Sequence, residues 1–165
     1  MKKLVLVCGP VGAGKTTYSL TLSKELQAVR FSIDPWMRTL FANDMKSLDF
    51  EWITERVDRC CKQIWETTEQ ILSLNGNVVL DLGFTTRKQR LKFSEKAKKI
   101  GVIAELHYLS AEKNVRWKRI EKRNKDQDPD VYSFELTEAM FKFMEPRFEA
   151  PSKEEIKNGY SVNSW

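Results

Sequence analysis

The sequence has little of what metal centres and disulfide scaffolds need. Among its 165 residues there is one histidine, His107, and there are three cysteines, Cys8, Cys60 and Cys61. An odd number of cysteines without CxxC spacing indicates neither a disulfide framework nor a zinc site. We expect Cys60 and Cys61 to pack within a helix, and His107 to pack within a strand. A reducing compartment, the cytoplasm, fits this cysteine usage best.

Long apolar runs are also missing. No stretch of about 18 apolar residues is present that could span a membrane. The first motif begins at Gly9, which leaves no room for a signal peptide before it. With 41% hydrophobic residues, a chain of this length can bury a core of its own. We therefore expect one domain, residues 1–165, that is soluble, cytoplasmic and not membrane-bound.

The formal net charge of +5 is concentrated in the middle of the chain. Residues 85–125 hold fourteen basic and four acidic side chains, whereas residues 126–165 hold four basic and nine acidic ones. A local surplus of positive charge favours phosphate-rich ligands, either nucleotide or nucleic acid. A pair of solvated helices with lysine-rich faces would give the same counts.

The most specific motif is GPVGAGKT, residues 9–16, which matches the phosphate-binding P-loop pattern GxxxxGK(S/T). An apolar run suited to a buried strand precedes it, and a helical pattern follows Lys15, as the motif requires. Glycines let the loop point successive N–H groups into one concavity at the positive end of the helix dipole. Lys15 is expected to reach the β- and γ-phosphates, and Thr16 to ligate Mg²⁺. The expected nucleotide contacts are Gly9, Pro10, Val11, Gly12, Ala13, Gly14, Lys15, Thr16 and Thr17.

Two later strands end in aspartates. Residues 29–33 are strand-like and precede Asp34 and Pro35, which predicts an N-cap at Asp34 and a short helix over residues 35–41. Residues 77–81 form a third buried strand that ends in Asp81, an arrangement that P-loop enzymes use beside Mg²⁺. Open α/β sheets bind ligands at the carboxyl ends of their strands, so Asp34 is expected to face the site. Asp81 is expected to contact Mg²⁺ or substrate, with capping of a turn as the alternative.

Periodicity places the remaining elements. It predicts helices over residues 16–27, 51–74, 86–100 and 133–144, a strand over residues 102–109, and a short closing strand over residues 160–162. Ser110 is expected to cap the helix that follows the fourth strand.

That helix carries Arg116, Arg119 and Arg123 at spacings of three and four, which places their side chains on one face. A guanidinium binds phosphate bidentately and keeps its charge. The polar run over residues 124–130 then predicts a mobile lid, residues 114–132 approximately, whose closure brings one or two arginines to the transferring phosphoryl group. A surface helix with exposed arginines is the alternative.

With these features in order, the chain resembles the small P-loop kinases of the AAA-like "predicted kinase" group. This group is related to the kinase domain of polynucleotide kinase, to chloramphenicol phosphotransferase and to zeta toxin. The resemblance covers residues 1–155 approximately and rests on the segments GPVGAGKTT, SIDPWMR, VVLDLGFTTRKQR, RWKRIEKRN and FEAPSKEE. It implies an α/β fold of the P-loop nucleoside triphosphate hydrolase type. The sheet would be parallel and five-stranded, of order 2-3-1-4-5, flanked by helices and covered by a helical lid.

The resemblance also implies roles for individual residues. Asp34 would be the general base toward an acceptor hydroxyl, although Asp81 could also serve and only the motif match favours Asp34. Arg38 would lie nearby and hold substrate or phosphate. The lid arginines would be Arg119 and Arg123, the first also a nucleotide contact, and further substrate contacts would be Asp81 and Arg87.

The leading hypothesis is therefore a kinase that uses ATP and Mg²⁺ to phosphorylate a hydroxyl of a small molecule or of a nucleic-acid end. One alternative is a 5′-hydroxyl polynucleotide kinase, which the charge supports although no aromatic stacking platform is interleaved with the basic residues. Another is a nucleotide switch without a phosphorylated product. By resemblance, GTPase switches carry DxxG and NKxD motifs, and here the corresponding segments are DLGF, residues 81–84, and NKDQ, residues 124–127, which match neither.

Overall fold

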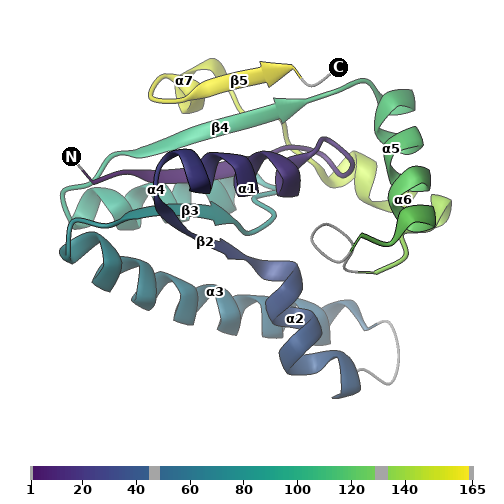
Figure 1. Ribbon diagram of the computed structural model, residues 1–165, viewed down its shortest axis with the longest axis horizontal. Coiled ribbons are helices and arrows are strands. Elements are labelled where there is room, and N and C mark those ends of the chain that lie inside the picture. Colours follow the sequence, from purple (N-terminus) through teal and green to yellow (C-terminus); the bar gives the residue numbers. More distant parts are fainter. Residues whose placement is uncertain (1, 45–48, 129–133, 164–165) are drawn as a thin grey trace.

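The computed structural model describes residues 2–44, 49–128 and 134–163 (Figure 1). Five parallel strands form one sheet in the order β2-β3-β1-β4-β5, which confirms the predicted topology. The strands are β1 (Leu4–Cys8), β2 (Ala28–Ser32), β3 (Asn77–Asp81), β4 (Ala104–Ser110) and β5 (Tyr160–Asn163). The predicted closing strand is thus present as β5, beside β4.

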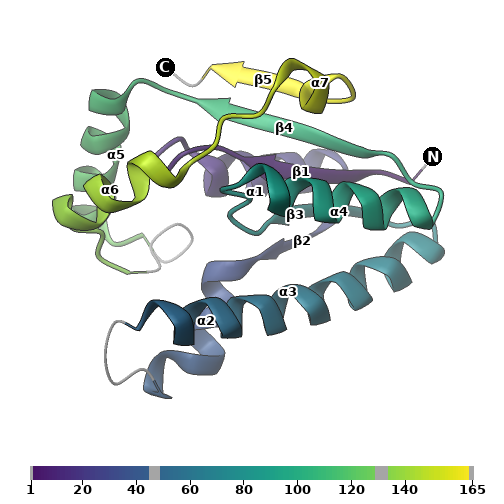
Figure 2. The same cartoon turned by 180° about the vertical axis from the view of Figure 1, so that it is seen from behind.

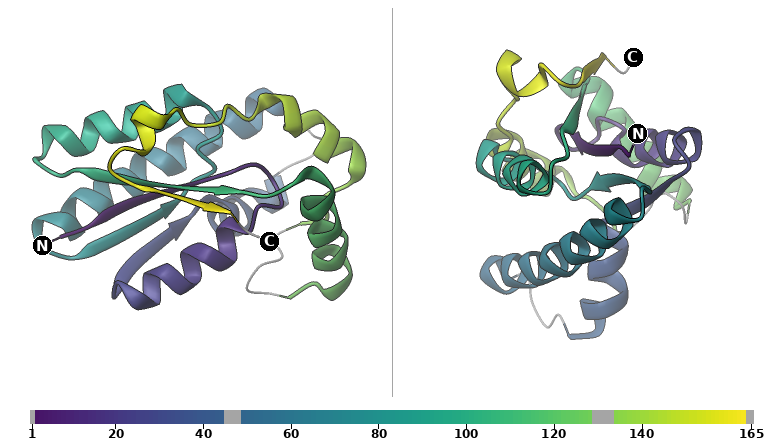
Figure 3. Two further views of the ribbon diagram at one scale, coloured as in Figure 1. Left: turned by 90° about the horizontal axis from the view of Figure 1, so that it is seen from above. Right: turned by 90° about the vertical axis from the view of Figure 1, so that its left-hand side faces the viewer.

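Helices cover both faces of this sheet (Figures 2 and 3). They are α1 (Lys15–Glu25), α2 (Ile33–Phe41), α3 (Phe50–Ser73), α4 (Arg87–Lys99), α5 (Lys113–Asp126), α6 (Glu138–Met144) and α7 (Lys153–Ile156), with 3₁₀ turns at Ala42–Asp44 and Glu145–Arg147. The central strand shows why both faces need cover, because every residue of β1 is buried. Leu4 and Leu6 pack in the cluster that includes side chains of α3 and α4, whereas Val5 and Val7 pack in the cluster that includes side chains of α1.

The helices α5 and α6 lie beyond the carboxyl ends of the strands, apart from the two layers that flank the sheet (Figure 1). A small apolar cluster joins them, in which Ile120 of α5 packs with Phe141 of α6 and with Leu136. Val11 of the P-loop also packs against this cluster. The predicted lid helix is therefore packed onto the end of the sheet where the P-loop lies.

The prediction that Asp34 is an N-cap was wrong. Helix α2 begins at Ile33, Ser32 occupies the N-cap position in an extended conformation, and Asp34 lies in the first turn. Pro35 is compatible with this earlier start, because the N–H groups of a first helical turn have no intrahelical partner in any case. In the first turn the Asp34 carboxylate still lies at the positive end of the helix dipole.

Two further helix starts differ from the sequence-based expectation. Ser110 does not cap a helix, because it remains paired within the sheet, opposite Asn163, and α5 begins only at Lys113. Helix α6 begins at Glu138 rather than Ser133, with the Thr137 side chain accepting a hydrogen bond from the Met140 N–H. Ser133 itself lies outside the described residues. The other predicted helices end within about two residues of the observed bounds, as is usual for helix termini.

The packing roles expected for the rare residues are confirmed. His107 is buried in β4, and its Nδ1 lies 2.8 Å from the hydroxyl of Tyr18. Cys60 is buried on α3, and Cys61 is half-buried there. Of the helices that the structure describes, none combines the length and apolar character that crossing a bilayer requires.

Candidate active site

The P-loop connects β1 to α1 and needs its glycines for two different reasons. Gly12 and Gly14 have φ of 80° and 91°, in the left-handed region that side chains disfavour. A Cβ on Gly12 would also lie 2.7 Å from the carbonyl oxygen of Arg116, whereas a Cβ on Gly14 would meet nothing within 4 Å. The loop thus packs directly against the first turn of α5.

Lys15 closes the loop with its own side chain. Its Nζ donates hydrogen bonds to the carbonyl oxygens of Gly9, at 2.9 Å, and Pro10, at 3.0 Å. Burial lowers the pKa of Lys15, and the nearby carboxylates of Asp81 and Asp34 act against that shift. Phosphate oxygens entering the loop would be stronger acceptors for this ammonium group than neutral carbonyls are.

Arg116 anchors α5 to the loop. Its buried guanidinium forms an ion pair with Glu145, with Nη2 at 2.5 Å from Oε1 and Nη1 at 2.8 Å from Oε2. Nη1 also donates to the carbonyl of Val11 at 3.1 Å, and Nε donates to the carbonyl of Ala111 at 3.0 Å. The hydrogen bond from Arg116 is the main influence that holds the pKa of Glu145 below its usual range. Arg116 is thus a structural member of the arginine face.

A cavity of about 680 Å³ lies between the P-loop, the ends of β2 and β3, and α5. It brings together most of the predicted site: Val11, Gly12, Ala13, Gly14, Lys15, Thr16, Thr17, Asp34, Asp81, Arg119 and Arg123. Lys122, Asp126 and Asp128 also line it, and the sequence had not singled them out. Phosphate-binding backbone, two arginines and two carboxylates thus share one space.

Four predicted residues do not line this cavity in the described structure. Gly9 and Pro10 begin the loop, and their carbonyl oxygens accept hydrogen bonds from Lys15. Arg38 lies in the last turn of α2, one turn beyond Asp34. Arg87 begins α4, and its largely exposed side chain lies 3.9 Å from Glu155. Substrate contacts by Arg38 and Arg87 therefore stay predictions.

Asp81 is held by residues that the motifs missed. The Nη2 of Arg30 lies 2.8 Å from Oδ2 of Asp81, and the Nε of Arg30 lies 2.6 Å from the Ser19 hydroxyl. That hydroxyl lies 3.2 Å from the same carboxylate oxygen and 3.0 Å from the carbonyl of Thr16. The only signal for Arg30 in the sequence is a single cation within an otherwise uncharged strand, AVRFS.

Asp34 lines the cavity and has a raised pKa. Asp34 is an exposed residue at the cavity, but protein atoms around its carboxylate keep part of the water away and raise its pKa. The neighbouring charge of Asp81 raises the pKa further, against the opposing influence of Lys15, Arg123 and Arg30. A carboxylate that binds a proton more readily than usual is better suited to general-base chemistry.

The residues of the cavity fit a bound Mg²⁺ ion when phosphates complete its coordination. No cluster of three or more His, Cys, Asp or Glu side chains that could hold a metal is present in the described part of the chain. Magnesium in kinase sites, however, needs only one or two protein oxygens besides phosphates and water. The Thr16 hydroxyl and Asp81 line the cavity, and the described hydrogen bonds of Asp81 use Oδ2, which leaves Oδ1 for such a role.

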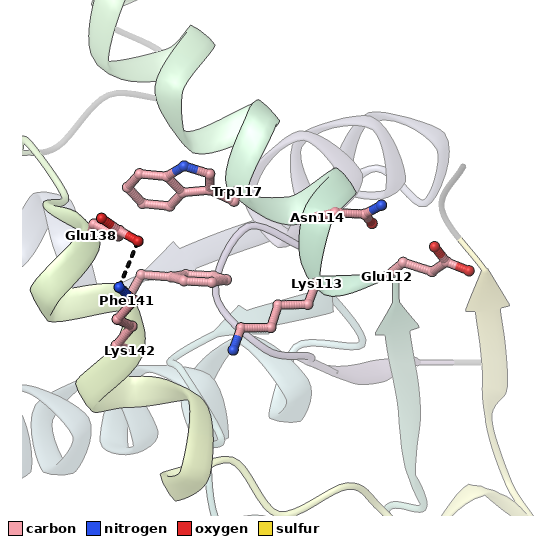
Figure 4. Close-up of a pocket in the computed structure, with 7 residues that line it drawn as sticks. All are labelled: Glu112, Lys113, Asn114, Trp117, Glu138, Phe141 and Lys142. Carbon is pink, nitrogen blue, oxygen red and sulfur yellow. Dashed lines mark ion pairs between the residues drawn. The ribbon is translucent and has the colours of Figure 1, made fainter.

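A second cavity, of about 520 Å³, lies between α5 and α6 (Figure 4). Trp117 packs against Phe141 there, with ring centroids 5.4 Å apart, and Glu138 forms an ion pair with Lys142. None of the residues that line it belongs to the P-loop or to the ends of β2 and β3. The larger cavity is therefore the candidate active site.

Comparison with known proteins agrees with this geometry. A family model described as an AAA domain matches residues 4–151. A search of the curated proteins finds no match.

Solved structures resemble this chain across almost its whole length. A sugar kinase from Janibacter sp. HTCC2649 has a TM-score of 0.62 at 15% identity, over 99% of this chain and 86% of that one. Kti12 from Chaetomium thermophilum, solved with ADP-AlF3, has a TM-score of 0.72 at 15% identity, over 97% and 88%. A chain of the Pnkp1/Rnl/Hen1 RNA repair complex has a TM-score of 0.63 at 17% identity, over 88% and 43%. At such identities the likeness concerns the fold.

Proposed function

Because this chain belongs to the AAA domain family and has the fold of small P-loop kinases, we propose that it is an ATP-dependent kinase that phosphorylates a hydroxyl group. The acceptor would be a small molecule or a nucleic-acid end. The observation that carries the proposal is one cavity that Lys15, Thr16 and Asp34 line together with two of the arginines of α5, Arg119 and Arg123.

The donor half of the site would be the P-loop. Its backbone N–H groups and Lys15 would hold the β- and γ-phosphates of ATP, and Mg²⁺, held by Thr16 and Asp81 together with the phosphates, would supply charge neutralisation when bound. Arg119 and Arg123 would stabilise the negative charge on the transferring phosphoryl group and its leaving oxygen, because both line the cavity from α5. Phosphoryl transfer needs little else from a protein than such positioning and electrostatic support.

The acceptor half would begin at Asp34. Its carboxylate would take the proton of the acceptor hydroxyl while the hydroxyl oxygen bonds to the γ-phosphorus and the bond from that phosphorus to the β,γ-bridging oxygen breaks, releasing ADP. This role is supported by the position of Asp34, which lines the same cavity as Lys15. Its raised pKa favours proton uptake.

The direct test is transfer of the labelled γ-phosphate of ATP to panels of nucleosides, oligonucleotides, sugars and antibiotics. With the best acceptor, Asp34→Asn is expected to lower kcat by about a hundredfold or more while the Kd for ATP stays within about threefold, because only proton transfer is lost. The matched control is Asp58→Asn on the exposed surface of α3, which should keep wild-type turnover. Wild-type turnover by Asp34→Asn would show that another group is the base.

A further inference from the structure

Arg30 is a nearly buried cation on the edge strand β2, with 14% of its side chain exposed. We propose that Arg30 is a positioning residue for phosphoryl transfer, which fixes the place of the Asp81 carboxylate relative to the P-loop helix α1. This inference rests on the function proposed above. It deepens that function by naming a residue that orients one of the two strand-end aspartates.

The strand register explains how Arg30 reaches Asp81. Ser32 of β2 is paired with Asp81 of β3, and Arg30 precedes Ser32 by two residues. The side chains of Arg30 and Asp81 therefore project to the same face of the sheet. Two residues of a strand span about 6.6 Å, a distance that the long arginine side chain can cross along the sheet toward its carboxyl end. Its Nη2 then lies 2.8 Å from the Asp81 carboxylate.

Ser19 makes this ion pair part of a larger frame. Its fully buried hydroxyl can accept a hydrogen bond from Nε of Arg30 and can donate its single hydrogen either to Asp81 or to the carbonyl of Thr16. Three separate elements, β2, β3 and α1, therefore meet at one hydroxyl. The position of Asp81 is thereby tied to the turn of α1 that carries Thr16.

The two strand-end aspartates consequently differ in how they are held. Asp81 has 6% of its side chain exposed, and its Oδ2 lies 2.8 Å from Nη2 of Arg30 in a charge-assisted hydrogen bond. Asp34 carries no such ion pair among the salt bridges of the described residues. The Asp81 carboxylate is thus held in one place by Arg30 and Ser19, whereas no described ion pair restrains Asp34.

A double-mutant cycle between Arg30→Met and Asp81→Asn tests this inference. Arg30→Met alone is expected to lower kcat by about thirtyfold with the Kd for ATP within about threefold, since positioning acts on the transfer step. In the Asp81→Asn background the same change should cost less than about twofold, because Arg30 acts through Asp81. Arg30→Lys, which keeps a cation near the carboxylate, should stay within about fivefold of the wild-type kcat.

The same set of variants also shows whether a loss of activity comes from a loss of stability. Removing one partner of a buried pair is far more destabilising than removing both, so the double variant is expected to melt closer to the wild type than Arg30→Met does. Arg59→Met is the matched control, because Arg59 pairs with Glu55 on the surface of α3, away from the cavity, and its loss should leave kcat unchanged.

The outcomes separate this inference from the proposed function. If the wild type transfers phosphate and Arg30→Met lowers kcat equally with and without Asp81, or not at all, Arg30 is no positioning residue and the kinase proposal stands. If the wild type phosphorylates no acceptor but hydrolyses ATP, the kinase proposal fails. The role of Arg30 is then decided by the same double-mutant cycle, with the rate of ATP hydrolysis as the measured quantity. If the protein neither transfers phosphate nor hydrolyses ATP, both the kinase proposal and the inference about Arg30 fail.

Discussion

Replacing Arg116 by methionine tests whether the first turn of α5 is anchored to the P-loop by electrostatics. Methionine keeps the apolar stem but removes the ion pair with Glu145 and the hydrogen bonds to the carbonyls of Val11 and Ala111. Breaking a fully buried pair costs about 3–5 kcal/mol. Glu145 keeps 26% of its side chain exposed, so water compensates part of its loss, and we expect the free energy of unfolding at pH 7 to fall by about 3 kcal/mol.

The same variant has a defined pH dependence. Arg116 lowers the pKa of Glu145 below its ordinary value of 4.5, so the pair contributes its full stability above that pH. As the pH falls through the lower pKa of the folded state, Glu145 takes up a proton and the wild type loses this advantage. The difference in unfolding free energy between wild type and Arg116→Met should therefore shrink as the pH falls below 4.5.

Urea denaturation at pH 7 and at about pH 3 measures both effects, provided that the unfolding is two-state. Lys142→Met is the control, because Lys142 and Glu138 form an exposed i,i+4 pair on α6 whose loss should cost no more than about 0.5 kcal/mol. The reasoning is refuted if Arg116→Met costs no more than Lys142→Met. A loss of equal size at both pH values would show that packing, rather than the ion pair, anchors α5.

Two further sets of variants test the loop and the lid. Gly12→Ala should destabilise the protein and abolish ATP binding, because the new Cβ would lie 2.7 Å from a backbone oxygen of α5. Gly14→Ala carries only the cost of its positive φ and should lower stability and ATP affinity less. Thermal melting and calorimetry with ATP measure the two effects. Asn124→Ala removes two hydrogen bonds to the backbone of Leu136 and should lower the free energy of unfolding by about 1–2 kcal/mol, with ATP affinity within about threefold because Asn124 does not line the cavity in the described structure.

The parts of this fold that the sequence predicts correctly are those with a local signal. The strands are short apolar runs, and the P-loop is defined by spacing within eight residues, so strand order and the phosphate-binding end of the sheet follow from the pattern and the family resemblance. The contacts between Arg30 and Asp81 join residues 51 positions apart, and those between Arg116 and Glu145 join residues 29 positions apart. No periodicity encodes such pairs, because a pair of charges has no preferred spacing once it bridges different elements. The helix start at Ile33 was missed for a different reason, namely that Pro35 is compatible with several positions in a first turn.

The arginine face of α5 shows how far spacing alone can be trusted. Arg116 and Arg123 are seven residues apart and so lie close to the same side of the helix, yet they are separated by about 10 Å along its axis. That distance decides their neighbours. Arg116, at the start of the helix, pairs with Glu145 and donates a hydrogen bond to the carbonyl of Val11. These contacts hold α5 to the loop. Arg119 and Arg123, one and two turns further along, line the cavity. The anchoring arginine, Arg116, and the two arginines that line the cavity thus form one arrangement, because the positions of Arg119 and Arg123 depend on how Arg116 holds α5.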